Sequence, residues 1–342
     1  MAGGSTIGRA NLAFGLVLMG TGVATSAEVV NVYTNREPGQ YSATLDEFTK
    51  ATGVKVNAIF SEQGLAERIA AEGDKSPADV LITVDIGRLQ QAIDLDVAQP
   101  IRSAAVDAAV PRNLHDANDL WTALSMRART IYTSKERVNE TALTYEGLAD
   151  PKWKGKVCTR SFQHPYNTAL TAAFLVKHGE AKTKTWLEGV KANLAKKPSG
   201  GDRDVAKDIA AGICDVGLGN SYYVGLMTNG TNEDQKGWAA AIRPVLPTFE
   251  GGGTQVNISG AVVAKHAPNR QNAEKLLAYM VSPAAQHVFA DVNYEYPVRE
   301  GVAVNPLIAS FGTLKPDPMK LSDVAKARKR ASELVDEVGF DR

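Results

Sequence analysis

Apolar, β-branched runs alternate with helical segments along the first part of this 342-residue chain, and this alternation constrains the fold more than any other feature. Residues 29–33 and 54–60 have the composition of strands. Residues 40–51 and 65–71 follow them with the spacing of helices. Residues 78–84 form a continuous apolar run, which is typical of a strand buried on both faces. The alternation predicts an α/β fold whose parallel strands are joined by helical crossovers.

Two longer extended runs, residues 122–133 and 256–264, interrupt this pattern, and strand–helix alternation resumes between them. We therefore expect two α/β lobes, each a mixed sheet flanked by helices. Two crossing strands would join them into a hinged clamshell that closes on a small ligand. The expected N-terminal lobe comprises residues 28–128 and 256–303, and the expected C-terminal lobe comprises residues 129–255 and 304–342. A single large α/β domain is the alternative.

The N-terminus has the pattern of an export signal. Arg9 precedes an apolar run from Leu12 to Met19, and small residues follow up to Ala27. This predicts a signal peptide over residues 1–27 and a mature protein outside the cytoplasm. A short membrane anchor is the alternative, although the run is shorter than the roughly 20 residues that span a bilayer. Equal numbers of basic and acidic residues, 38 of each, argue against nucleic acid as a partner.

The chain has two cysteines, Cys158 and Cys214, both in strand-like runs. An even pair in an oxidising compartment favours a disulfide, here between neighbouring strands. Two buried free thiols are the alternative. Two thiols alone do not complete a tetrahedral zinc site.

A tyrosine follows each cysteine at the same spacing. Cys158 lies eight residues before Tyr166, and Cys214 lies eight residues before Tyr222, which Tyr223 follows directly. Both segments have the order strand, polar loop, tyrosine, helix. Ligands in open α/β sheets lie at the carboxyl ends of strands. We therefore expect all three phenols to face one cleft.

Two element ends are predicted from turn and cap residues. The strand before the tyrosine pair is expected over residues 213–218, with Gly219-Asn220 as the turn that ends it. An amphipathic helix is expected over residues 322–338, with Ser322 as its N-cap.

Three converging phenols suit one class of metal ion. A phenol has a pKa near 10, so it becomes a ligand only where a strongly charged cation displaces its proton. Magnesium and calcium prefer carboxylate, carbonyl and water oxygens, and zinc prefers Cys, His and carboxylate. Ferric iron is hard and trivalent, so Tyr166, Tyr222 and Tyr223 indicate Fe³⁺. The alternative is that the adjacent tyrosines only pack at a strand end.

Three phenolates leave about half of an octahedron open, which a small anion such as carbonate can fill. Arginine suits such an anion because its planar fork binds it in a bidentate manner. Arg36 follows the first strand, and Arg127 and Arg129 alternate on one side of the first crossing run. Any of these arginines is a candidate, and a solvated or salt-bridged role is the alternative for each.

Glu37, Asp85 and His164 are further candidates for the cleft. Asp85 follows a strand and is equally suited to cap the next helix. No nucleophile elbow, dinucleotide or P-loop fingerprint, or zinc-protease motif is present in the sequence, so we do not expect an enzyme. A secreted hydrolase that uses Glu37 or His164 is the remaining enzyme alternative.

These motifs together resemble those of the periplasmic ferric-ion-binding proteins of bacterial ABC iron importers, a branch of the transferrin-like clamshell proteins. The resemblance extends over essentially the whole mature chain. It rests on residues 32–36, 78–85, 127–129, 158–161, 166–167 and 219–223. In the branch that uses three tyrosines, one follows a second-lobe strand and two are adjacent further on. Tyr166, Tyr222 and Tyr223 match those positions.

The first lobe departs from some relatives. Glu37-Pro38 stands where some have His-Tyr, and Val84 stands where others have a glutamate ligand. The first lobe is thus expected to supply no strong metal ligand, or Glu37 alone. The resemblance implies Fe³⁺ bound with a synergistic carbonate, which Arg36 or Arg129 holds. It also implies a periplasmic monomer that delivers iron to an inner-membrane ABC permease. A clamshell binder of a small organic anion or phosphonate is the alternative.

Overall fold

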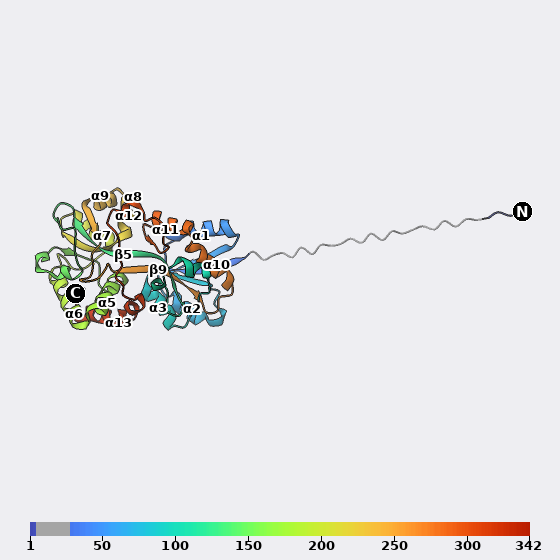
Figure 1. Cartoon of the computed structure of the whole chain (residues 1–342), viewed down its shortest axis with the longest axis horizontal. Helices are drawn as coiled ribbons and strands as arrows, with labels where there is room; N and C mark the ends of the chain where they lie inside the picture. The colour runs from blue at the N-terminus through green and yellow to red at the C-terminus, as the bar shows by residue number, and fades with distance from the viewer. Residues whose placement is uncertain (5–27) are drawn as a thin grey trace.

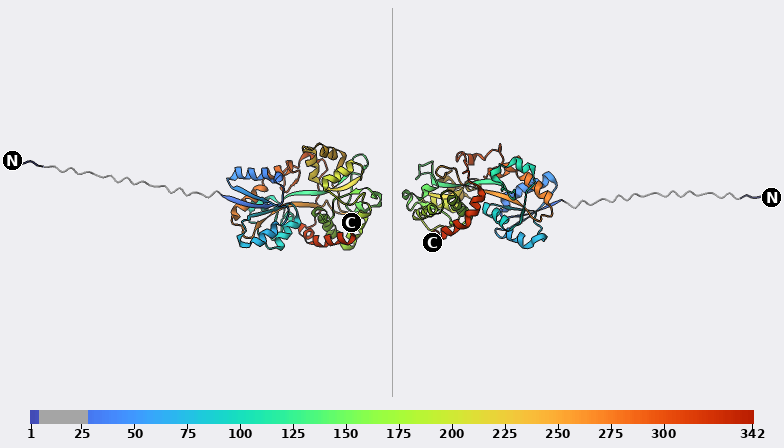
Figure 2. Two further views of the ribbon diagram at one scale, coloured as in Figure 1. Left: turned by 180° about the vertical axis from the view of Figure 1, so that it is seen from behind. Right: turned by 60° about the horizontal axis from the view of Figure 1, so that its bottom comes forward.

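The computed structural model describes residues 1–4 and 28–342, and it shows an elongated molecule made of two lobes (Figure 1). The views from behind and from below show the same two parts (Figure 2). Each lobe has its own hydrophobic core, with Phe48 and Leu89 in the first and Trp186 and Leu187 in the second. The predicted two-lobe α/β architecture is confirmed.

The first lobe is built on parallel strands. β1 (Val29–Thr34) lies between β2 (Lys55–Phe60) and β3 (Val80–Thr83) and is parallel to both. All residues of β3 are buried, because helices cover both faces of the sheet (Figure 1). The helices that follow these strands are α1 (Pro38–Thr52), α2 (Leu65–Glu72) and α3 (Ile86–Asp94). Strand β9 (Val256–Ala264) continues the sheet antiparallel to β3, so the sheet is mixed.

Strand β5 (Thr122–Ser134) runs between the lobes and changes its pairing partner halfway. Up to Ala128 it pairs with β9, whereas from Arg129 to Thr133 it pairs with β7 (Val216–Asn220). The strand therefore leaves one sheet and enters the other between Ala128 and Arg129. Residues on either side of this point meet different neighbours.

The second lobe places two helix starts side by side. β6 (Val157–Cys158) lies parallel to β7, and β8 (Ile242–Val245) lies antiparallel to the end of β5. Helix α5 (Pro165–His178) follows β6, and α8 (Ser221–Asn229) follows β7. Because parallel neighbouring strands end at one edge of the sheet, both helices begin at that edge.

The end of β7 differs from the prediction of a strand over 213–218 and a turn at Gly219-Asn220. The strand runs from Val216 to Asn220, and the next residue already belongs to α8. Gly219 pairs with Thr130 of β5, and a Cβ on this glycine would collide with the ring of Tyr132. The glycine thus permits close approach of a side chain rather than a turn.

The C-terminal helix α13 (Leu321–Val338) has no side-chain cap. Its N-cap position is Lys320, which makes no capping hydrogen bond, and Ser322 lies within the first turn. The prediction that Ser322 caps this helix is therefore wrong. The helix packs against α5 of the second lobe and α3 of the first, so it contacts both lobes.

Short strands and further helices complete the two lobes. They are β4 (Ala98–Gln99), α4 (Ala104–Ala109), α6 (Glu180–Ala192), α7 (Asp202–Ala210), α9 (Glu233–Ala241), α10 (Arg270–Met280), α11 (Pro283–Asp291), β10 (Tyr296–Pro297) and α12 (Pro306–Ala309). Within the described ranges, no helix has the length and apolarity needed to cross a bilayer. The predicted signal peptide, residues 1–27, lies from residue 5 onward outside the described residues.

A disulfide joins Cys158 to Cys214, which confirms the prediction from the sequence. Cys158 is the last residue of β6, and Cys214 lies two residues before β7. Both cysteines are buried. The bond therefore ties together the two strands that lead into α5 and α8.

Removal of this disulfide should destabilise the protein. The cysteines are separated by 56 residues, and closing a loop of that size restricts the unfolded chain, so we expect a loss of about 2–4 kcal/mol. Urea unfolding of the Cys158→Ala/Cys214→Ala variant, compared with the oxidised parent, measures the loss. The reduced parent serves as the control, and an unchanged unfolding midpoint would contradict the prediction.

Candidate functional site

Three tyrosines meet where α5 and α8 begin. Tyr166 is the second residue of α5, and Tyr222 and Tyr223 follow Ser221 at the start of α8. The phenol oxygens of Tyr166 and Tyr222 lie 3.3 Å apart. The ring centroids of Tyr222 and Tyr223 are 4.3 Å apart. The parallel pairing of β6 and β7 thus brings together side chains that are 56 residues apart in the sequence.

The phenols line a cavity of about 90 Å³ to which both lobes contribute. Its lining residues are Asn35, Glu37, Gln40, Val84, Arg127, Tyr166, Tyr222, Tyr223 and Glu295. In the part of the chain that the structure describes, no group of three or more His, Cys, Asp or Glu side chains could hold a metal ion. The three phenols lie beside the Glu37 and Glu295 carboxylates, so these are the oxygen donors that the cavity offers to a metal.

Burial favours the protonated forms of the Tyr222 and Tyr223 phenols. Burial, followed by the neighbouring Tyr166 and Tyr223, raises the pKa of Tyr222 well above its usual value. Burial, together with Tyr166, raises the pKa of Tyr223 to about 12. A phenolate forms here only if a cation compensates its charge.

Arg127 is a buried arginine whose guanidinium is not fully used by the protein. Its side chain is 1% exposed and lines the cavity. Its Nη1 reaches the Ser259 hydroxyl at 3.5 Å, whereas Nε and Nη2 have no hydrogen-bond partner among the described residues. Its Cζ lies 5.5 Å from the ring centroid of Tyr166. A buried donor without a partner is costly, so these nitrogens indicate a place for an anion.

Two more guanidiniums stack on the tyrosine rings. Arg160 lies 5.3 Å from the ring centroid of Tyr166, and Arg203 lies 4.8 Å from that of Tyr223. Cations at such distances are attracted to the ring face. Arg160 also partly offsets the effect of burial that raises the pKa of Tyr223.

Both arginines that the sequence singled out for the anion already have buried protein partners. Arg36 donates to the Ser259 hydroxyl at 2.8 Å and forms an ion pair with Glu295 at 2.5 Å. Arg129 forms an ion pair with Asp202 at 2.6 Å and does not line the cavity. The sequence placed Arg127 beside Arg129 as an equivalent candidate, because nothing in the local pattern separates them.

The remaining candidates lie around the cavity in different roles. Glu37 is exposed and lines it from the first lobe. Asp85 caps α3 by accepting a hydrogen bond from the Gly87 amide at 2.8 Å. His164 caps α5, and its Nδ1 accepts the Tyr166 amide at 3.2 Å. Burial, with the nearby Arg160, lowers the pKa of His164 to about 3, so the ring is neutral at neutral pH.

The chain is similar over most of its length to known solute-binding and iron-binding proteins. A family model of bacterial extracellular solute-binding proteins matches residues 35–287. The iron uptake protein A1 of Synechocystis sp. is 40% identical over 313 residues, which cover 91% of this chain and 87% of that protein. The structure of a Bordetella ferric binding protein has a TM-score of 0.87 at 56% identity, covering 92% of this chain and 100% of that one.

A second solved structure, the Mannheimia haemolytica ferric iron-binding protein A in an open conformation, has a TM-score of 0.87 at 48% identity. The match covers 92% of this chain and 100% of that one. The family consists of transport proteins that bind solutes, which confirms the prediction that this chain is not an enzyme. The two-lobe fold and the match over most of the sequence show that the chain belongs to the bacterial extracellular solute-binding protein family.

Proposed function

We propose that this protein binds ferric iron through Tyr166, Tyr222 and Tyr223. The proposal rests above all on three phenols from two helix starts that line one cavity, with two of their oxygens 3.3 Å apart. Octahedral metal–oxygen bonds of about 2.0–2.1 Å place adjacent oxygens about 2.9 Å apart. A small movement of either ring would let both oxygens bind one ion. The ferric-binding relatives support the choice of cargo.

The protonation state of the phenols favours a strongly charged ion. Because burial raises the pKa of Tyr222 and of Tyr223, a cation must displace both protons to gain their oxygens as ligands. A hard trivalent ion does so more readily than a divalent one. Three phenolates then balance the charge of Fe³⁺.

A small anion, carbonate in our proposal, would complete the coordination and lie against Arg127. The free Nε and Nη2 of Arg127 form one edge of its guanidinium, and such an edge suits two oxygens of a planar anion. Arg36, which is paired with Glu295, would support Arg127 through the Ser259 hydroxyl, to which both arginines donate. Arg129 is the weaker candidate because Asp202 already neutralises it. Glu37 would be an additional first-lobe contact.

The two-lobe geometry supports capture and delivery. We propose lobes of residues 28–128 with 256–303 and residues 129–255 with 304–342, which close about the crossing strands. The partner change of β5 and the cavity lined from both sides support this division. Membership of the extracellular solute-binding family supports a periplasmic protein, exported by residues 1–27, that delivers iron to an ABC permease. We propose that it acts as a monomer.

A small organic anion or phosphonate is the second candidate cargo. A larger cavity of about 570 Å³ shares Asn35 with the phenol cavity and extends along α2 and α3 to Arg88. Titration calorimetry with organic anions, with and without iron, separates the two possibilities. Binding of such an anion in the complete absence of iron, and no binding of iron itself, would favour this second candidate.

Addition of ferric iron and bicarbonate to the metal-free protein should produce a visible phenolate-to-iron charge-transfer band. The Tyr222→Phe variant should lose most of this band and bind iron more than about 100-fold more weakly, since even groups outside the first coordination shell contribute 10–100-fold. Absorption spectra and competition with a chelator measure both effects. Tyr279→Phe, which changes a tyrosine of α10 that does not line the cavity, is the control. A colourless parent, or equal binding by both variants, would contradict the assignment.

Acid should release the metal steeply. Binding that deprotonates three phenols liberates about three protons, so the apparent association constant should fall by up to about 1000-fold for each unit of falling pH. The sign follows from the raised pKa values of Tyr222 and Tyr223, which make the protonated forms stronger competitors as pH falls. Chelator competition over a pH series, corrected for protonation of the chelator, measures the slope. A slope near zero would exclude phenolate ligation.

Loss of Arg127 should remove the dependence on bicarbonate. In Arg127→Gln the anion loses its guanidinium, so iron affinity should fall about 10–100-fold and added bicarbonate should no longer raise it. Iron titrations in bicarbonate-free and bicarbonate-containing buffer measure this. Arg88→Gln, at the neighbouring cavity, is the matched control. If Arg127→Gln responds to bicarbonate like the parent, another residue holds the anion.

A further inference from the structure

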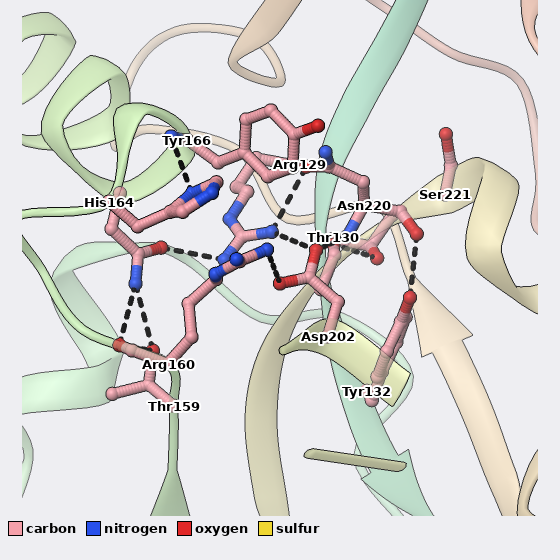
Figure 3. Close-up of polar contacts among 12 residues, drawn as sticks. Arg129, Thr130, Tyr132, Thr159, Arg160, His164, Tyr166, Asp202, Asn220 and Ser221 are labelled. Carbon is pink, nitrogen blue, oxygen red and sulfur yellow. Dashed lines mark hydrogen bonds and ion pairs between the residues drawn. The ribbon is translucent and has the colours of Figure 1, made fainter. Parts of the chain in front are cut away.

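Arg129 lies behind the tyrosines and connects the two helix starts that carry them. Its guanidinium is buried and donates hydrogen bonds to Asn167, Asn220 and Asp202 (Figure 3). Asn167 directly follows Tyr166, and Asn220 lies two residues before Tyr222. One side chain thus reaches both segments from the crossing strand.

On the Tyr166 side, Arg129 is bonded to Asn167, which is bonded in turn to the loop before α5. Nη2 of Arg129 donates to Oδ1 of Asn167 at 2.6 Å. The side-chain nitrogen Nδ2 of Asn167 in turn donates to the Thr159 hydroxyl at 3.0 Å and to the carbonyls of Arg160 and Ser161 at 3.0 and 3.2 Å. These residues form the loop between β6 and α5. The position of the Asn167 side chain therefore fixes where α5, and with it Tyr166, begins.

On the Tyr222 side, Arg129 is linked to Asn220 both directly and through the Asp202 carboxylate. Nη1 of Arg129 donates to Oδ1 of Asn220 at 3.0 Å and to Oδ2 of Asp202 at 2.6 Å. The same Oδ2 accepts the backbone amide of Asn220 at 2.8 Å. Beside it, the Ala128 amide donates to the Ser221 hydroxyl at 3.2 Å. The last residue of β7 and the first of α8 are thereby bound to β5 immediately before the tyrosine pair.

The charged form of the Asp202 carboxyl is favoured in this network. Asp202 is fully buried, and although burial favours its protonated form, Arg129 and Arg160 hold the pKa of this carboxyl below its usual value. Arg160, which also stacks on Tyr166, reaches Oδ1 of Asp202 at 3.4 Å. Desolvation offsets much of what a buried ion pair contributes to stability. Stability alone is therefore a weak explanation for this pair.

We propose that Arg129 is a positioning residue that sets the separation between Tyr166 and the Tyr222–Tyr223 pair by bonding to both segments at once. This inference rests on the proposed function, since it concerns the geometry of the iron ligands. The planar fork of arginine directs donors toward several acceptors at fixed angles, whereas lysine carries one compact charge on a flexible stem. Lysine could keep the ion pair with Asp202 without holding both asparagines.

Arg129→Lys therefore tests the inference in the full-length protein. We expect a folded variant whose iron affinity falls about 10–100-fold and whose charge-transfer band shifts or weakens, because the phenols no longer meet at one distance. Arg137→Lys is the matched control. Arg137 belongs to the same lobe and binds Asp215 at 2.6 Å and the Ile209 and Cys214 carbonyls, but it bonds to neither Asn167 nor Asn220. It should lose stability without a change in the iron band.

Asn167→Ala gives a second, milder test that leaves the ion pair intact. It removes the Arg129 contact on the Tyr166 side together with the bonds of Asn167 to the loop before α5, so it should also weaken iron binding and alter the band. Its effect should not add to that of Arg129→Lys in the double variant, because both disturb one network. Thermal unfolding without iron shows that each variant is folded under the conditions of the titration.

The outcomes separate the two proposals. If the parent binds iron and both folded variants have the parent's affinity and band, Arg129 has only a structural role and the inference is overturned. If the parent itself binds no ferric iron, the proposed function fails and this inference fails with it. If Arg129→Lys does not fold, Asn167→Ala alone decides, and a parental band in that variant would overturn the inference.

Discussion

The pairing of β5 with two different strands is the constraint on which the site depends. The strand leaves β9 and joins β7 between Ala128 and Arg129. Arg127 consequently lines the cavity that both lobes form, while Arg129 lies behind the helix starts of the second lobe. A single strand thereby supplies one guanidinium to the cavity and one to its supporting network. Motion of one lobe relative to the other would therefore bend or twist this strand.

The charges near the cavity suit phenol side chains that lose their protons only when a cation binds. Arg36, Arg127 and Arg129 are among the largest fully buried side chains of the described residues. Arg36 and Arg129 have carboxylate partners, as buried charges normally require. Among the described residues, two nitrogens of Arg127 have no partner, and they line the same cavity as Tyr222 and Tyr223, whose pKa values burial raises. Entry of a cation together with an anion would satisfy both at once, which is the physical basis for proposing that they bind together.

The second lobe holds its two tyrosine segments together at two places. The disulfide joins the last residue of β6 to the chain just before β7, and the Arg129 network joins the residues where α5 and α8 begin. Gly219 lets Tyr132 pack close to β7, and the Tyr132 hydroxyl donates to the Asn220 carbonyl at 2.6 Å. These bonds therefore hold the segments that carry the phenols in place within the second lobe. The first lobe contributes mainly the opposite wall of the cavity.

The sequence by itself determined the α/β class and favoured two lobes and a disulfide, because strand runs, helical spacing and paired cysteines are local or compositional signals. It also brought out the tyrosines, through the matched spacing from Cys158 and Cys214. It did not separate Arg127 from Arg129, which alternate identically along one run. Only the tertiary structure decided that, because the surroundings of each depend on where β5 changes partner and on Asp202, a residue far away in the chain. The end of β7 was decided in the same way, by cross-strand pairing of Gly219 that no local turn pattern encodes.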